Sequence, residues 1–160
     1  MKPDPAALAS LNAIIGHDIA AIERLDLELQ RIAASLNSPA PDFRDLAAAA
    51  YTFHNLYNAL ENSFEQISRT FENHVVDQAQ WHKELLEKMF LSIPKIRPAV
   101  LPPNLRKILH DLRGFRHIFR HSYDFELDAE RLRYLLQHWN SEKTALIKAM
   151  RDFGASLLSA

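Results

Sequence analysis

The 160-residue chain contains no cysteine and only three glycines. Without cysteine it forms neither disulfides nor thiolate metal sites, which fits a reducing compartment, and we expect a cytoplasmic protein. No segment resembles a signal peptide, and no uninterrupted apolar run approaches the roughly 18 residues of a membrane span, so no membrane association is expected. The eight prolines cluster near residues 3–5, 39–41 and 94–103. Long runs rich in Ala, Leu, Glu and Arg lie between these clusters and predict an all-α protein.

The length fits a single domain over residues 1–160 that can bury a proper core. Apolar residues at helical spacing predict about five helices: residues 4–37, 42–71, 77–91, 104–121, and a last one that Asp128 caps. The first helix carries a regular four-three apolar seam from Leu11 to Leu36, interrupted only by Asp18, whose place in the packing Ile19 can take. Such a seam needs a long antiparallel partner, so we expect an antiparallel helical bundle.

Positive charge is concentrated in one short segment of the chain. Residues 105–123 carry five Lys or Arg against one Asp, whereas residues 1–104 carry nine against thirteen Asp or Glu, and residues 124–160 five against six. A local basic stripe on an acidic body indicates a focused anion site rather than a surface that coats nucleic acid. The alternative is an ordinary solvated helix face.

The basic segment coincides with the predicted fourth helix. On a wheel of about 100° per residue with Leu112 at zero, Arg116 falls at about 40°, on the edge of the apolar face. His110, His117 and His121 fall at about 140–180°, opposite that face, so a single-chain bundle would leave all three in water. They are then either simple exposed histidines or part of a face that meets a second copy of the chain.

The residues of the basic segment are candidates for metal binding or for catalysis. His117 and His121 have the i, i+4 spacing of a metal pair, but no carboxylate ligand accompanies them and arginines surround them, so no metal site is expected. Gly-rich phosphate loops are absent from the sequence, and no cofactor is expected. Metal-free RNA cleavage fits better, because it needs a proton-transferring group such as His121 and a cation such as Arg116 that grips the phosphate. A symmetric dimer would bring two of each into one cleft.

A family resemblance follows from these residues. The segment Phe115-Arg116-His117-x-x-Arg120-His121-x-Tyr123, with its R-x4-H-x-Y pattern, resembles the HEPN superfamily, most of all the HepT-like ribonuclease toxins. Trp81-His82-x-x-Leu85-Leu86 resembles a W-H-x-x-L-L segment of one HepT-like branch. The likeness spans roughly residues 50–158. One departure is His117, where family members often carry Asn or Asp.

The resemblance implies an up-down bundle that forms a homodimer and acts as a metal-independent endoribonuclease toxin. It implies Arg116 and His121 as the catalytic pair, with His117 and Arg120 in support. The implied partner is a minimal nucleotidyltransferase antitoxin that adenylylates Tyr123, although this phenol is also explained by packing at the helix end. Two other readings of the chain stay open: a non-catalytic HEPN-type module that binds a nucleotide or its nucleotidyltransferase partner, and a plain bundle with an accidental motif.

Overall fold

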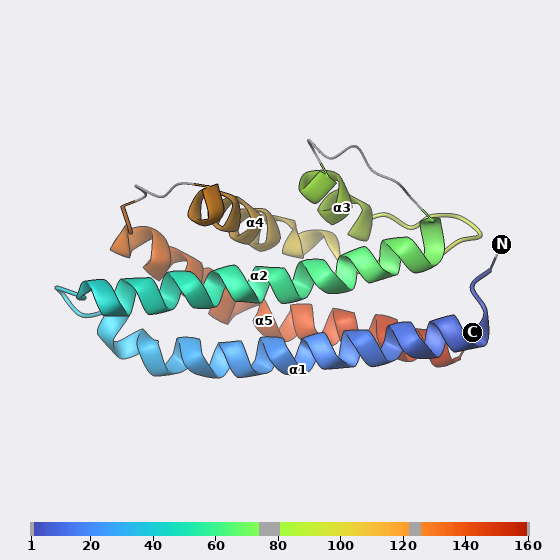
Figure 1. Cartoon of the computed structure of the whole chain (residues 1–160), viewed down its shortest axis with the longest axis horizontal. Helices are drawn as coiled ribbons and strands as arrows, with labels where there is room; N and C mark the ends of the chain where they lie inside the picture. The colour runs from blue at the N-terminus through green and yellow to red at the C-terminus, as the bar shows by residue number, and fades with distance from the viewer. Residues whose placement is uncertain (1, 74–80, 122–125, 160) are drawn as a thin grey trace.

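The computed structural model in Figure 1 describes residues 2–73, 81–121 and 126–159. Within these residues the chain forms no strand and five α-helices: α1 (Pro5–Leu36), α2 (Phe43–Glu72), α3 (Trp81–Met89), α4 (Arg106–His121) and α5 (Ala129–Leu158). A short 3₁₀ helix, η1 (Pro103–Leu105), leads into α4. The all-α prediction is confirmed, and the observed helix bounds agree with the expected ones within about two residues. The exception is the expected start of α3 at Asp77, which lies outside the described residues.

The three long helices form the body of the molecule. α1 and α2 run antiparallel side by side, and α5 packs along α1 in the opposite direction to it (Figure 1). The shorter α3 and α4 lie on α2, on the side away from α1, and α4 also contacts α5. The predicted apolar stripe of α5 is buried as expected, with Trp139 at its centre. This arrangement exposes the outer side of α4 and presses its inner side onto α2.

Aspartate side chains cap the N-termini of α2 and α5. Asp42 accepts a hydrogen bond from the backbone N–H of Asp45, whose side chain accepts one from the backbone N–H of Asp42 in return. Asp128 accepts from the backbone N–H of Glu130 at the start of α5. The cap at Asp128 was expected, and both caps form because Asp oxygens satisfy N–H groups that have no partner within the helix.

Asp18 is the polar residue in the seam of α1, and it is buried along with Ile19. Ile19 therefore joins the packing, but it does not displace Asp18 from it. The carboxylate accepts hydrogen bonds from Asn62 at 2.8 Å and Ser63 at 2.7 Å, both on α2. The burial cost of a charge is offset by these two donors, which also fix the register of α1 on α2.

The proline-rich segment between α3 and α4 is irregular, as expected, and one arginine anchors it. Arg97 is buried and donates to the carbonyl oxygens of Lys88, Leu91 and Pro98. It also donates to Glu72 at the end of α2 through both Nε and Nη2. Burial alone would raise the pKa of Glu72, but hydrogen bonds from Arg97 and Lys88 lower it below the usual value. The buried ion pair thus ties the loop to α2.

Among the helices that the structure describes, only α1 is long and apolar enough to cross a membrane, with a mean hydropathy of 1.3 over its most apolar window of 18 residues. That window contains polar residues among the apolar ones, so it is not an uninterrupted apolar run. In the fold, α1 packs its seam against α2 and α5. Core helices of soluble proteins share these properties, so α1 is weak evidence for a membrane span.

Candidate functional site

Arg116 is on the inner edge of α4 and is only 7% exposed. Its Nε donates to Asn58 Oδ1 at 2.5 Å, and its Nη2 lies 3.3 Å from Glu61 Oε1. The guanidinium carbon lies 5.9 Å from the ring centroid of Tyr57. All three partners belong to α2. The wheel position of Arg116 at the core edge is confirmed, and α2 supplies the counter-charge that makes its burial possible.

The contacts of Arg116 continue on both sides as a polar chain. Glu61 is 6% exposed, and its second oxygen, Oε2, lies 2.8 Å from Nδ1 of His82 on α3. On the other side, Nδ2 of Asn58 lies 3.1 Å from Nε2 of His54. None of these four α2 and α3 residues, His54, Asn58, Glu61 and His82, was expected from the sequence as a site residue. The available signal was the i, i+4, i+7 spacing of the first three, which places them on one face of α2.

His54 stays neutral at this site. Burial, followed by the positive charges of Arg116 and Arg120, lowers the pKa of His54 below its usual value. The Asn58 amide donates through Nδ2, so Nε2 of His54 is the acceptor and Nδ1 carries the proton. That Nδ1 is buried and has no hydrogen-bond partner among the described residues. The neutral imidazole thereby fixes the Asn58 amide with its oxygen toward Arg116.

The ring of Tyr57 lies against the Arg116 guanidinium. Burial, reinforced by the negative charge of Glu61, raises the pKa of Tyr57 far above its usual value, so the phenol stays protonated. Its hydroxyl is buried and makes no hydrogen bond within the described part of the chain. Tyr57 therefore supplies an aromatic face to Arg116 and no proton-transfer chemistry.

His117 and His121 are exposed on the outer side of α4, as expected. Nδ1 of His121 lies 2.9 Å from the backbone carbonyl oxygen of His117, and the two rings are 4.5 Å apart. A carbonyl oxygen only accepts hydrogen bonds, so Nδ1 of His121 carries a proton in this contact and Nε2 is the other ring nitrogen. Arg120 beside them is exposed and forms no hydrogen bond or ion pair with the described residues.

The expectation that His110 would lie in water is wrong. Its side chain is 23% exposed, and Nε2 lies 2.5 Å from Glu87 Oε1 on α3. The wheel placed His110 correctly relative to the core of α4, but α3 packs beside α4 and covers that sector. The same carboxylate also pairs with Arg106. His110 is thus part of the α3–α4 contact.

Ion pairs reduce the positive charge of the basic stripe. Arg106 pairs with Glu87, Lys107 lies 3.3 Å from Asp111, and Arg116 pairs with Glu61. Arg113 and Arg120 form no ion pair within the described residues, and Nε of Arg113 approaches His110 Nδ1 at 3.4 Å. The anion-attracting charge of α4 is therefore concentrated toward its C-terminal half.

A single copy of the chain does not bring the two expected catalytic residues together. Arg116 faces α2, whereas His121 is exposed, and no contact joins them in the described structure. Tyr123, the expected modification site, lies outside the described residues. In the same described part of the chain, no three His, Asp or Glu side chains are grouped as metal ligands.

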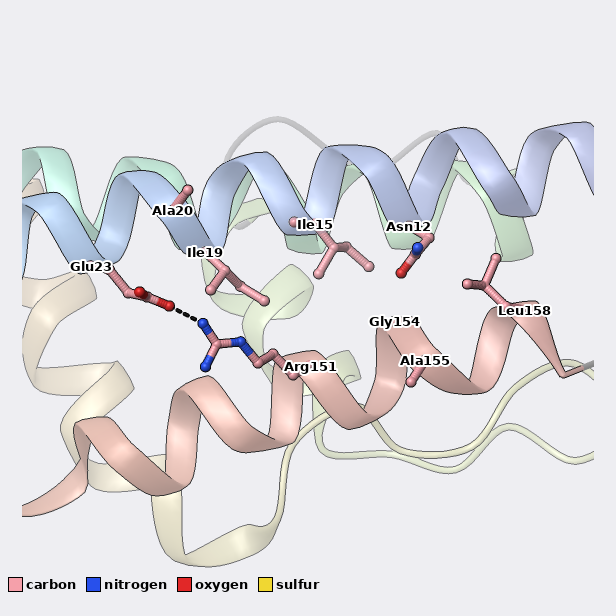
Figure 2. Close-up of a pocket in the computed structure, with 10 residues that line it drawn as sticks. Asn12, Ile15, Ile19, Ala20, Glu23, Arg151, Gly154, Ala155 and Leu158 are labelled. Atoms are coloured by element: carbon pink, nitrogen blue, oxygen red, sulfur yellow. Dashed lines mark hydrogen bonds and ion pairs between the residues drawn. The ribbon is translucent and has the colours of Figure 1, made fainter.

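A groove of about 380 Å³ lies elsewhere, between α1 and α5 (Figure 2). Its walls are mainly small and apolar, and Glu23 and Arg151 across it bond to each other. Asn12 Oδ1 fills the space over Gly154, where a Cβ would approach to 2.8 Å. The two charged side chains that line this groove are thus paired with each other, and the candidate site residues lie elsewhere, on α4 and its partners on α2 and α3.

Comparison with known proteins identifies the family of the chain. A family model described as HepT-like protein matches residues 48–157, which include α3, α4 and nearly all of α2 and α5. No curated protein and no solved structure matches the chain. The match covers more than half of the chain and contains Arg116, His121 and every residue of the polar chain around Arg116. The chain belongs to the HepT-like family.

Proposed function

We propose that this protein is a metal-independent endoribonuclease toxin whose active site forms in the cleft of a homodimer. The observation that carries the proposal is the Arg116-x4-His121 pair at the basic end of α4 in a HepT-like chain. Two features support it. Among the described residues, neither Nε2 of His121 nor Nη1 of Arg116 has a hydrogen-bond partner.

The proposed reaction uses the RNA 2′-hydroxyl as nucleophile. An imidazole Nε2 removes its proton, the 2′-oxygen bonds to phosphorus, and the bond to the 5′-oxygen breaks. A second imidazole donates a proton to that leaving oxygen, so the products are a 2′,3′-cyclic phosphate and a 5′-hydroxyl. The free end of the Arg116 guanidinium stabilises the charge that develops on the phosphorane. Arg120 and His117 add positive charge or hydrogen bonds along the RNA backbone.

Incubation of the purified protein with RNA in EDTA tests the proposal. We expect cleavage to persist and the products to carry 2′,3′-cyclic phosphate ends. His121→Ala and Arg116→Ala should each lower the rate by at least about 10²-fold, because each removes a group that acts in the transition state. His17→Ala, which alters an exposed imidazole on α1, is the control and should cleave like the parent. Loss of cleavage in EDTA, or an unchanged rate in His121→Ala, contradicts the mechanism.

We also propose that the protein acts in the cytoplasm with a minimal nucleotidyltransferase antitoxin that adenylylates Tyr123. An added AMP would carry a phosphodiester charge, which competes with RNA phosphate for the arginines of the site. Tyr123→Phe should keep the ribonuclease activity and escape neutralisation by the cognate nucleotidyltransferase with ATP. Loss of cleavage in Tyr123→Phe would make the phenol catalytic instead.

A second candidate function is a non-catalytic binding module for a nucleotide or for the nucleotidyltransferase. The observation that favours it is the pairing of buried Arg116 with Glu61, which cancels part of the charge that a phosphate would meet. The same RNA assay separates the two candidates, because a binding module retains RNA or nucleotide without cleaving it.

A further inference from the structure

His82 belongs to the Trp81-His82-x-x-Leu85-Leu86 segment of the sequence. The proposed reaction gives His82 no role. It lies in the first turn of α3, and its side chain is 37% exposed. Nδ1 lies 2.8 Å from Glu61 Oε2, and the ring of Trp81 packs edge-on against the imidazole with the centroids 4.8 Å apart. Because a carboxylate only accepts, Nδ1 of His82 is the donor in this contact.

Glu61 divides its two oxygens between two helices. Oε2 accepts from His82 on α3, and Oε1 faces Nη2 of Arg116 on α4 at 3.3 Å. A buried carboxylate with one oxygen unpaired would turn to recover the lost hydrogen bond. Any such turn moves Oε1 and therefore the guanidinium that it holds. Glu61 thus links His82 to Arg116, although the two residues make no direct contact in the described structure.

The geometry points to His82 as a positioning residue that aims the free end of the Arg116 guanidinium through Glu61. This inference rests on the proposed function, since the aimed group is the one that meets RNA phosphate. Asn58 holds the Nε side of the same guanidinium, so the two contacts together leave Nη1 for an anion. Small displacements of such a group have large kinetic effects.

A double-mutant cycle tests the inference. We expect His82→Ala to lower kcat on the order of 10- to 100-fold while KM for RNA changes little, because the aim of Arg116 matters most in the transition state. In an Arg116→Ala background the same change should have no further effect, because no guanidinium is left to aim. An equal loss in both backgrounds assigns His82 an independent role and overturns the inference.

Two amide variants of His82 add a rescue test. Asn places its amide nitrogen where Nδ1 of His lies, whereas Gln places it nearer the position of Nε2. We therefore expect His82→Asn to retain more activity than His82→Gln or His82→Ala. Lys83→Ala, at the neighbouring exposed position, should behave like the parent. Equal activity of the Asn and Ala variants would overturn the inference.

A measurement without RNA separates this inference from the proposed function. The Nε–H signal of Arg116 in a ¹H–¹⁵N spectrum, assigned by its loss in Arg116→Lys, should shift or broaden in His82→Ala and stay in place in Lys83→Ala. If that signal moves but the parent cleaves no RNA, the proposed function fails and the positioning contact stands. If the signal is the same in His82→Ala as in the parent, the positioning role is overturned whatever the activity.

Discussion

The two ends of the Arg116 guanidinium have different surroundings. Asn58 and Glu61 take the Nε side of the guanidinium, and the opposite end has no partner in the described chain. A lysine at this position could not make both contacts and still offer a donor in the same direction. The buried pair with Glu61 fixes the orientation of the guanidinium. The negative charge of Glu61 would also weaken the attraction of Arg116 for a phosphate.

The lowered pKa of His54 predicts a pH-dependent stability. When the chain unfolds, His54 regains its ordinary pKa of about 6.5 and binds a proton below that pH, whereas the folded state stays neutral down to its lower pKa. The unfolded state then holds more protons, so the free energy of unfolding falls as the pH drops through this range. Above about pH 6.5 the full contribution is present.

Urea unfolding at about pH 7.5 and about pH 5.5 checks the prediction. His54→Gln keeps an acceptor for Asn58 without titrating, so it should lose less stability on acidification than the parent. His17→Gln, which removes an imidazole that is 79% exposed, should lose as much as the parent. An equal loss in His54→Gln and the parent would show that His54 does not remain neutral in the fold.

At the residue scale the sequence predicted the position of Arg116 but not its partners. The wheel of α4 depends only on local spacing, so it placed Arg116 at the core edge correctly. Glu61 precedes Arg116 by 55 positions and belongs to a different helix, α2. Its burial depends on how α2 is rotated against α3 and α4, which spacing within one helix does not specify.

At the scale of elements, the helix bounds and caps were predictable, because capping residues and prolines act locally. The lateral packing of the short helices was not. α3 contacts α4 through Glu87, and that contact removes His110 from the solvent-exposed face where its wheel position placed it. The irregular segment before α4 was predicted from its prolines, but its anchoring by Arg97 required the position of Glu72.

Arg97→Ala should therefore destabilise the fold strongly. The change leaves Glu72 without its buried partner and three backbone carbonyl oxygens without a donor. Breaking a buried ion pair in this way costs about 3–5 kcal/mol. Lys95→Ala, in the same loop but exposed, should stay within about 0.5 kcal/mol of the parent. Chemical denaturation measures both changes, and a loss below about 1 kcal/mol for Arg97→Ala would show that the loop holds without this anchor.

At the scale of the whole molecule, the charge asymmetry of the sequence is smaller in the fold. Acidic residues from α2 and α3 pair with Arg116 and Arg106, so the most clearly unpaired cation near the site is Arg120. Arg116 and His121 also point in different directions within one copy. A second copy related by a two-fold axis could present its His121 to the Arg116 of the first. This arrangement would explain why one chain alone holds the two groups apart.

Mixing two inactive variants tests the shared cleft. Dimers of Arg116→Ala with His121→Ala contain one intact Arg116 and one intact His121, on different copies. If the site joins Arg116 of one copy with His121 of the other, one of the two sites in each mixed dimer is complete. Coexpression at equal levels makes about half of the dimers mixed, so about a quarter of the parental activity should return if one His121 per site is enough for the reaction.

The assembly itself must be measured alongside the activity. Sedimentation should find the parent as a dimer at micromolar concentration, and native mass spectrometry of differently tagged copies should find the mixed dimer in the coexpressed sample.

Mixed dimers without recovered cleavage would mean that Arg116 and His121 act within one copy, or that the reaction needs both imidazoles of the cleft. A dimer of His121→Ala with the parent separates these two cases, because it keeps one complete copy but only one His121. Retained activity there favours action within a copy, and its loss favours a site that requires two histidines. A parent that sediments as a monomer while cleaving RNA would contradict the shared cleft altogether.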